Sequence, residues 1–163
     1  MREDERTPAT FLRKLALTHD KQMRLKVLRA YARLDTRLAE KVLVGALGDP
    51  CEEIRDFIVR ELAEREDLDI DLVCNRLAGP PWYARSAVLK IVGLRKAPKA
   101  VRYIERILDD PNADVRRSAA DALGAIGGRE VLALLVRLKK DANPYVRQAA
   151  EEGLRRASDL KFV

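Results

Sequence analysis

An apolar residue followed by arginine recurs along this chain at a nearly constant interval. The arginines of these pairs are separated by 31, 30, 31 and 31 residues, and they are Arg24, Arg55, Arg85, Arg116 and Arg147. A fixed period of this length is typical of repeat solenoids, because each unit buries its apolar face only by stacking on its neighbours. The 163 residues have room for about five such units.

Each unit is predicted to contain two helices. Counted from the repeated arginine, apolar residues recur at positions −1, +3 and +7, as in Val115, Ala119 and Leu123. These positions lie on one face of a helix, so they predict a buried stripe. The segment before each arginine has its own helical spacing of apolar residues, as in Val101 and Ile104. A unit therefore consists of a first helix, a turn and a second helix.

The boundaries follow from this pattern and from turn signals such as Asp-Pro, whose aspartate is expected to cap the second helix. We expect one domain over 1–163, with units at approximately 7–34, 35–65, 66–95, 96–127 and 128–157 and a tail at 158–163. The first helices are expected at 8–17, 36–48, 68–78, 98–109 and 129–140. The second helices are expected at 21–34, 51–65, 81–94, 112–126 and 143–157.

Position +8 of the second helix holds a small residue in four units and an arginine in the fifth. The residues are Ala32, Ala63, Gly93, Gly124 and Arg155. A small residue lets a neighbouring helix approach closely, whereas the terminal unit of a solenoid needs a polar outer face. We therefore expect close packing between successive second helices and a polar cap on the fifth unit.

The composition agrees with a helical stack and leaves the role of its charge open. Charged residues make up 36% of the chain and aromatic residues only 5%, which favours helices around a thin core. The net charge of +6 is uneven, because residues 1–80 carry −1 and residues 81–163 carry +7. Either the C-terminal half attracts an acidic partner, or the excess is an ordinary solvated surface.

No constellation of residues points to catalysis, a metal or a cofactor. Cys51 and Cys74 have no paired spacing and are expected to be buried thiols within helices. His19, the sole histidine, is expected to be a cap or a surface residue, and there is no glycine-rich phosphate loop. The chain shows no secretory core and no apolar run of membrane-spanning length, so we expect a cytoplasmic protein without membrane contact.

The segment from Asp110 to Gly127 resembles a HEAT-type repeat, in the short form found in phycobilin lyases and many bacterial proteins. The fifth unit, from Asn143 to Leu154, resembles it closely too, and the first three units are more diverged. This resemblance implies an all-α fold, a right-handed α-solenoid of about five two-helix HEAT-like repeats. Together with the absence of a catalytic constellation, this repeat fold leads us to expect a non-enzymatic protein.

The resemblance further implies a ladder of ion pairs between the turn aspartates and the repeated arginines. Mapped at a separation of six residues, the pairs are Asp49 with Arg55, Asp110 with Arg116, and Asp141 with Arg147. The same offset gives Thr18 and Gly79 in the first and third units, where the ladder is therefore expected to lack its acid. A half-buried charge needs such a partner, which favours a structural role for the arginines over an anion-binding one.

The favoured function is that of a protein-interaction scaffold that binds another protein on a concave surface lined by the second helices. Exposed aromatic residues beside Arg or Lys are typical interface anchors. The candidate partner-binding residues are Arg29, Phe57, Arg60, Trp82, Tyr83, Lys90 and Tyr145, with Phe57, Arg60, Trp82, Tyr83 and Lys90 expected to form one patch. In the alternative interpretation, Trp82 only packs over the Pro-rich turn before it.

Two further functions remain open at this point. Nucleic acid could bind the basic C-terminal half, with phosphate contacts from Lys96, Lys99, Arg102, Arg106, Lys139 and Lys140. The chain could also be an accessory subunit of a bilin lyase-like system, since the repeats resemble those of the lyases.

Overall fold

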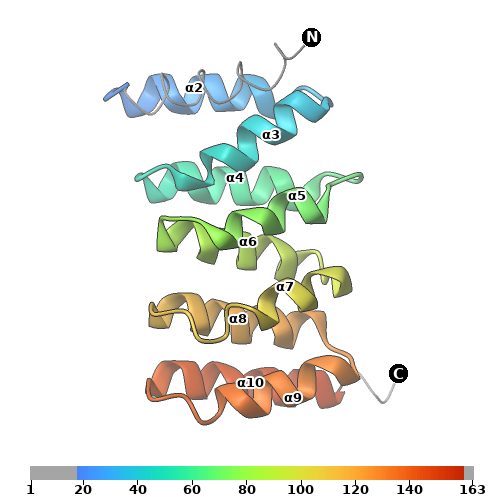
Figure 1. The fold of residues 1–163 in the computed structure, drawn as a ribbon. Coiled ribbons are helices and arrows are strands. Elements are labelled where there is room, and N and C mark those ends of the chain that lie inside the picture. Colours follow the sequence, from blue (N-terminus) through green and yellow to red (C-terminus); the bar gives the residue numbers. More distant parts are fainter. Residues whose placement is uncertain (1–17, 160–163) are drawn as a thin grey trace.

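The computed structural model describes residues 18–159, which form a stack of paired helices (Figure 1). The α-helices are α2 (Lys21–Ala32), α3 (Arg37–Gly45), α4 (Glu52–Glu64), α5 (Ile70–Cys74), α6 (Trp82–Leu94), α7 (Val101–Glu105), α8 (Ala113–Ile126), α9 (Arg129–Leu138) and α10 (Pro144–Asp159). Three short 3₁₀ helices join them, η1 (Ala46–Gly48), η2 (Asn75–Ala78) and η3 (Pro98–Ala100). This part of the chain contains no strand, so the fold is an all-α solenoid.

The helices lie close to the ranges that the periodicity predicts. The second helices α2, α4, α6, α8 and α10 each begin within one residue of the expected start. The first helix of the fourth unit is shorter than expected, because α7 ends at Glu105 and the chain then tightens into a turn in which Ile107 N–H donates to Ile104 O at 3.0 Å. The helix expected at 8–17 lies outside the described residues.

The core is a continuous stripe along the stack, built from the positions that the sequence pattern selects. Val115, Ala119 and Leu123 of α8 are fully buried, and so are Ile54, Ile58 and Leu62 at the same positions of α4. Burial of apolar surface provides the main stabilisation, and each unit obtains it from its neighbours. No helix between residues 18 and 159 has both the length and the apolar character that crossing a membrane requires.

Successive second helices pack directly on one another, and small residues set how closely they approach. A Cβ added to Gly93 would lie 3.2 Å from the Cα of Ala122 on α8. A Cβ added to Gly124 would lie 2.5 Å from the Cα of Gly153 on α10, closer than real Cβ atoms come. The prediction of a small residue at position +8 is thus explained at Gly93 and Gly124, where this position meets position +6 of the next unit.

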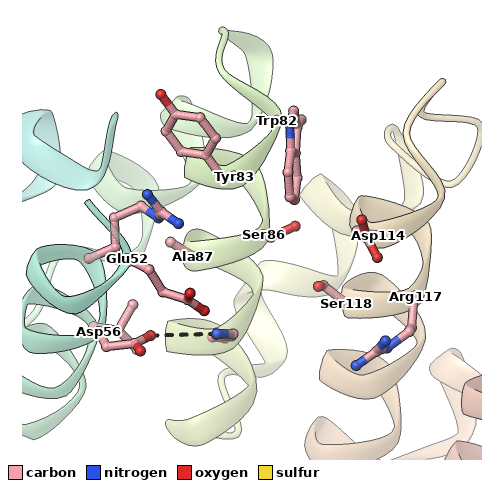
Figure 2. Close-up of a pocket in the computed structure, with 12 residues that line it drawn as sticks. Glu52, Asp56, Trp82, Tyr83, Ser86, Ala87, Asp114, Arg117 and Ser118 are labelled. Atoms are coloured by element: carbon pink, nitrogen blue, oxygen red, sulfur yellow. Dashed lines mark ion pairs between the residues drawn. The ribbon is translucent and has the colours of Figure 1, made fainter. Parts of the chain in front are cut away.

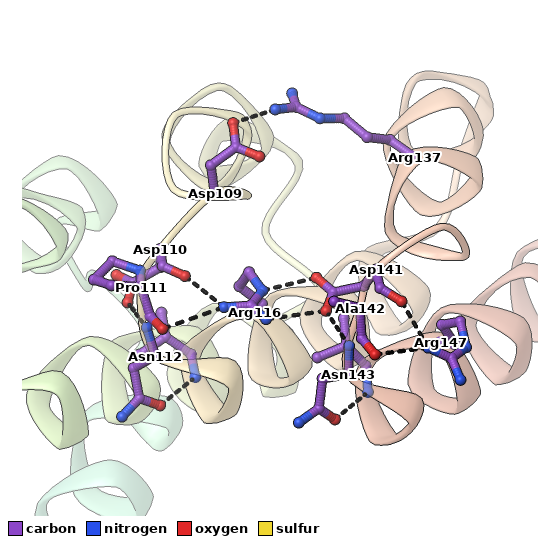
Figure 3. A network of polar contacts seen from close by, with 12 residues as sticks. Asp109, Asp110, Pro111, Asn112, Arg116, Arg137, Asp141, Ala142, Asn143 and Arg147 are labelled. Atoms are coloured by element: carbon purple, nitrogen blue, oxygen red, sulfur yellow. Dashed lines mark hydrogen bonds and ion pairs between the residues drawn. The ribbon is translucent and has the colours of Figure 1, made fainter.

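The repeated arginines form a ladder along the stack, but with a register that differs from the expected one. Arg116 donates from Nε and Nη2 to the carboxylate of Asp141, 25 residues ahead, at 2.7 and 3.0 Å (Figure 3). Its Nη1 donates to the backbone carbonyl of Asp110, six residues behind, at 2.7 Å. Arg116 therefore bridges the turn of its own unit to the turn of the next unit. The predicted pairing of the Arg116 guanidinium with the Asp110 carboxylate is wrong.

The same bridge recurs in the first and third units, where an acid was expected to be missing. Arg24 binds the carboxylate of Asp49 at 2.8 and 3.2 Å, and Arg85 binds that of Asp110 at 2.7 and 3.0 Å. The unit that lacks the acid is the second, because the residue 25 positions after Arg55 is Pro80. The predicted pair of Arg55 with the Asp49 side chain is wrong too, since Arg55 donates to the backbone carbonyl of Asp49 at 2.8 Å.

Among residues 18–159, the fifth arginine likewise binds only its own turn. Arg147 donates from Nη1 to the backbone carbonyls of Asp141 and Ala142, at 2.8 and 2.9 Å. The predicted pair of Arg147 with the Asp141 carboxylate is therefore also wrong, because that carboxylate binds Arg116 instead.

The turn aspartates stabilise their turns without capping the second helices. Asp110 accepts a hydrogen bond from Asn112 N–H at 2.9 Å, as in an Asx-turn. The N-cap of α8 is Asn112, whose side chain accepts from the N–H groups of Asp114 and Val115. Asp141 and Asn143 repeat this arrangement in front of α10. Each aspartate can therefore bind its own turn and the arginine of the preceding unit together.

The close contact of the second helices predicts that Gly124→Ala destabilises the protein. The new methyl would overlap backbone atoms of Gly153, which cannot move aside as a flexible side chain can. We expect the free energy of unfolding to fall by about 1–3 kcal/mol in chemical denaturation. The control is Gly79→Ala, whose Cβ would meet only the Arg76 side chain at 3.8 Å, and a Gly124→Ala variant as stable as this control would contradict the packing.

The ladder predicts a pH-dependent contribution of Asp141 to stability. Hydrogen bonding to Arg116 lowers the pKa of Asp141 below its usual value. The stabilisation is then complete above the unfolded pKa of about 3.9, and it is lost as pH falls through the lower folded pKa. Asp141→Asn should lower the free energy of unfolding by about 1.5–3 kcal/mol at neutral pH.

Denaturation across about pH 3 to 7 measures this effect, with Asp67→Asn as the control because Asp67 is exposed and makes no ion pair within residues 18–159. The gap between the wild type and Asp141→Asn should narrow as the pH falls. A gap that stays constant or widens would show that Asp141 does not stabilise the folded state through its charge.

Candidate functional site

The break in the ladder places Arg55 against an aromatic ring. With no carboxylate at position 80, the guanidinium of Arg55 lies over the ring of Tyr83, with its carbon 4.4 Å from the ring centroid. This is a cation–π contact between α4 and α6. Tyr83 in turn meets Trp82 in an edge-to-face arrangement, with the ring centroids 5.7 Å apart. Arg55 therefore holds an aromatic pair at the start of α6.

These aromatic residues line a pocket on the outward side of the second helices α4, α6 and α8, which we call the second-helix face (Figure 2). The pocket has a volume of about 270 Å³. Its lining residues are Glu52, Arg55, Asp56, Val59, Trp82, Tyr83, Ser86, Ala87, Lys90, Asp114, Arg117 and Ser118. The lining thus combines two aromatic rings with charges of both signs.

The charges in the pocket differ in whether they already have partners. Lys90 lies 3.6 Å from Asp56, an exposed pair of small energetic value. Glu52 and Asp114 are exposed, and their carboxylates have no ion pair or hydrogen bond among the residues that the structure describes. The unpaired charge of the pocket is therefore mainly acidic, apart from Arg117.

Ser86 lies in the pocket wall with an unused hydrogen-bonding group. The residue is only 8% exposed, and its Oγ has no hydrogen-bond partner within the described part of the chain. In Figure 2 the oxygen points into the gap between α6 and α8, opposite Ser118. A buried hydroxyl without a partner costs free energy, so this group is suited to a hydrogen bond from a ligand.

Three of the predicted partner-binding residues come together here, and four do not. Trp82, Tyr83 and Lys90 line the pocket, and Trp82 is 42% exposed, which argues against packing over the turn as its only role. Arg60 is exposed and borders a neighbouring shallow depression with Glu52 and Asp56. The depression and the pocket share Glu52, Asp56 and Val59, so Arg60 lies beside the pocket without lining it.

Phe57, another of the candidate partner-binding residues, is only partly exposed. Its ring is half-buried against the core, and the guanidinium carbon of Arg29 lies over it, 5.9 Å from the ring centroid. Tyr145, 66% exposed at the start of α10, borders a separate depression with Arg117 and Asp121.

Sequence reasoning missed three residues that shape the pocket. Arg55 was assigned to the ladder, and Ser86 at position +1 and Asp114 at position −2 were not singled out. Both positions lie outside the predicted buried stripe at −1, +3 and +7, and that was the available signal for Ser86 and Asp114. For Arg55 the signal was Pro80, which removes its acid.

The basic residues proposed for nucleic acid lie around η3 and α7 and just after α9 rather than in the pocket. Lys99 and Arg102 both bind the carboxylate of Asp71, at 2.6 and 2.9 Å, and the Tyr103 hydroxyl donates a hydrogen bond to the same carboxylate. Together these three contacts lower the pKa of Asp71 to about 2. The guanidinium carbon of Arg106 lies over the Tyr103 ring, 5.8 Å from the ring centroid. Lys139 lies 3.7 Å from Glu151, and Lys96 and Lys140 are exposed. Several of these cations thus already have acidic partners.

The two cysteines and the histidine lie outside the pocket. Cys51 is the half-buried residue before α4 rather than part of a helix, and Cys74 is buried at the end of α5. Burial raises the pKa of the Cys74 thiol to about 12, which makes the thiol unreactive. His19 is exposed in the turn before α2. Within residues 18–159, no cluster of three or more His, Cys, Asp or Glu is placed to hold a metal ion.

The contact between Arg55 and Tyr83 predicts that the aromatic ring of Tyr83 contributes more to the free energy of unfolding than its hydroxyl does. Tyr83→Phe should leave the free energy of unfolding within about 0.5 kcal/mol of the wild type. Tyr83→Leu should lower it by about 0.5–2 kcal/mol, because the cation loses its aromatic partner. In an Arg55→Leu background the two variants should differ less, and an equal difference in both backgrounds would contradict the contact.

The comparisons with known proteins agree with this architecture. A family model of HEAT repeats matches residues 70–155, which is more than half of the chain and includes α6, α8 and the end of the solenoid. A search of curated proteins found no match. On the repeat match and the stacked helix pairs, the chain belongs to the HEAT repeat family.

Proposed function

We propose that the whole chain is one repeat domain that acts as a non-enzymatic scaffold and binds another protein on its second-helix face. HEAT repeats commonly serve as protein-interaction scaffolds. The observation that carries the proposal is the pocket, in which an exposed Trp82 and a fixed Tyr83 stand among charged residues. Aromatic residues held in place and surrounded by polar groups are typical of interface hot spots.

The geometry favours the middle of this face as the place of contact. Tyr83 is held by Arg55 on one side and by Trp82 on the other, so a partner would meet a preorganised surface. Preorganised side chains lose less conformational entropy on binding. The side chains at the same level of the neighbouring helices, Glu52 and Asp114, are exposed and able to form a polar rim around the rings.

No contact favours nucleic-acid binding by the basic residues around α7 and after α9. Lys99 and Arg102 already share Asp71, so a phosphate would have to compete with this carboxylate. The role of a bilin lyase-like accessory subunit rests on repeat-level resemblance alone. We propose a cytoplasmic location, in which the two thiols stay reduced.

Replacement of Trp82 tests the scaffold proposal. The chain would be used to capture proteins from a lysate of its source cell, and the affinity of the purified partner would then be measured for each variant. Trp82→Ala should weaken binding by about 1–2 kcal/mol, and so should Arg60→Ala if the contact extends to that side. The control is Leu94→Ala, which removes another exposed apolar side chain of α6 outside the pocket.

The location of the contact needs a separate measurement. Photo-crosslinking residues would replace Lys90 on the second-helix face and Glu105 on α7, both of which are exposed. The partner should crosslink at position 90 and not at position 105. Crosslinks confined to position 105, or an unchanged affinity of Trp82→Ala, would reject binding at this face.

A further inference from the structure

One end of the pocket forms a slot between α6 and α8, lined by Trp82, Ser86, Asp114, Arg117 and Ser118, which we call the α6–α8 slot. We propose that this slot receives an arginine side chain of the partner protein, between the face of Trp82 and the carboxylate of Asp114. The inference rests on the proposed scaffold function and names the chemistry that the site recognises.

The Trp82 ring is the first part of the argument. In Figure 2 the ring stands as one wall of the slot, with Tyr83 on one side and Asp114 on the opposite wall. Tyr83 already faces a cation, because Arg55 lies over it, whereas no cation lies over Trp82 within residues 18–159. Tryptophan is the best aromatic partner for a cation, so the exposed face of this ring favours a positive guest.

The charge of the slot is the second part. Asp114 is exposed across from Trp82 and has no ion pair within the described residues, and Glu52 on α4 is likewise without a partner. The cations Arg55 and Lys90 of the same pocket are occupied by Tyr83 and Asp56. A guest beside Trp82 therefore meets free negative charge.

Arg117 is the one cation that opposes this assignment. It lies one helical turn beyond Asp114, and in Figure 2 its guanidinium points away from Trp82. Its charge is offset by Asp121, whose carboxyl it influences from the next turn of α8. The repulsion that Arg117 exerts on a cationic guest is thus partly compensated. Removal of the Arg117 charge should still raise the affinity for such a guest, whereas removal of the Asp114 charge should lower it.

The hydroxyl of Ser86 is the third part, independent of charge. It is more than nine-tenths buried, lacks a partner and points into the slot between the two helices. It can accept a hydrogen bond from an N–H donor that enters between Trp82 and Asp114. Arginine fits these three features better than lysine, because a planar guanidinium stacks on an indole and still directs several N–H donors to a carboxylate and a hydroxyl.

The test uses short peptides and the fluorescence of Trp82, which is the only tryptophan of the chain and so reports on the slot alone. The probes are acetyl-Gly-Ala-Arg-Ala-Gly-amide and the same peptide with citrulline, which has the shape of arginine without its charge. The arginine peptide should change the emission and bind at least about tenfold more tightly than the citrulline peptide, as expected for a lost cation–π contact and ion pair. Equal binding of the two peptides would overturn the proposal.

Two charge variants of the full chain sharpen the test because their expected effects are opposite. Asp114→Asn should lower the affinity for the arginine peptide about five- to tenfold, and Arg117→Gln should raise this affinity about twofold. The control Asp67→Asn, an exposed acid outside the slot, should change nothing. Stronger binding to Asp114→Asn with weaker binding to Arg117→Gln would show an anion site and reject the assignment.

The peptide experiment and the partner experiment fail in distinguishable ways. If neither peptide binds while the partner still crosslinks at position 90, the arginine assignment is wrong and the scaffold function stands. If the peptides bind as expected while the partner crosslinks only at position 105, the slot recognises arginine but is not the partner's contact.

Discussion

Each repeated arginine that has an acid ahead of it joins two turns of the solenoid. Its Nη1 donates to the carbonyl six residues behind, and its Nε and Nη2 bind the carboxylate 25 residues ahead. The same carboxylate accepts an N–H of its own turn. One guanidinium thus fixes the spacing between neighbouring units at the N-terminal ends of their second helices. Towards the C-terminal end of α8, the spacing is set instead by the backbone contact of Gly124 with Gly153 on α10.

The candidate site arises where this interaction is interrupted. Pro80 occupies the place of an acid, so the Arg55 side chain turns to Tyr83 and fixes it beside Trp82. The stack continues there through apolar packing, since Val59 of α4 and Ala87 and Val88 of α6 are buried in one core. The regular residues of the repeat hold the units together, and the irregular ones line the aromatic pocket.

The helices and the core could be predicted from the sequence because they depend on the spacing of apolar residues, which is local. A ladder of arginines and aspartates was expected as well, but its register could not be predicted, because the period allows two pairings. With a period of 31, a given aspartate lies six residues before its own arginine and 25 after the preceding one, as Asp110 does for Arg116 and Arg85. The pattern offers both pairings, and only the direction of the side chains in the stack decides between them.

The candidate site could be predicted only in part, because its residues come from three different units of the repeat. Trp82 and Tyr83 were among the candidate residues, but their neighbours in the pocket include residues of α4 and α8, about one period away in either direction. Phe57 lies outside the predicted stripe at −1, +3 and +7, yet its ring is partly buried against the core and lies under Arg29. Ser86 is buried because three helices meet around it.

The register of the ladder is tested most directly by double-mutant cycles around Asp110, measured as free energies of unfolding. In the structure the Asp110 carboxylate binds Arg85, whereas Arg116 contacts only its backbone carbonyl. We expect a coupling energy of about 1–3 kcal/mol between Asp110→Ala and Arg85→Ala, and a much smaller one between Asp110→Ala and Arg116→Ala. A strong coupling to Arg116 together with a weak coupling to Arg85 would contradict this account of how the repeats are joined.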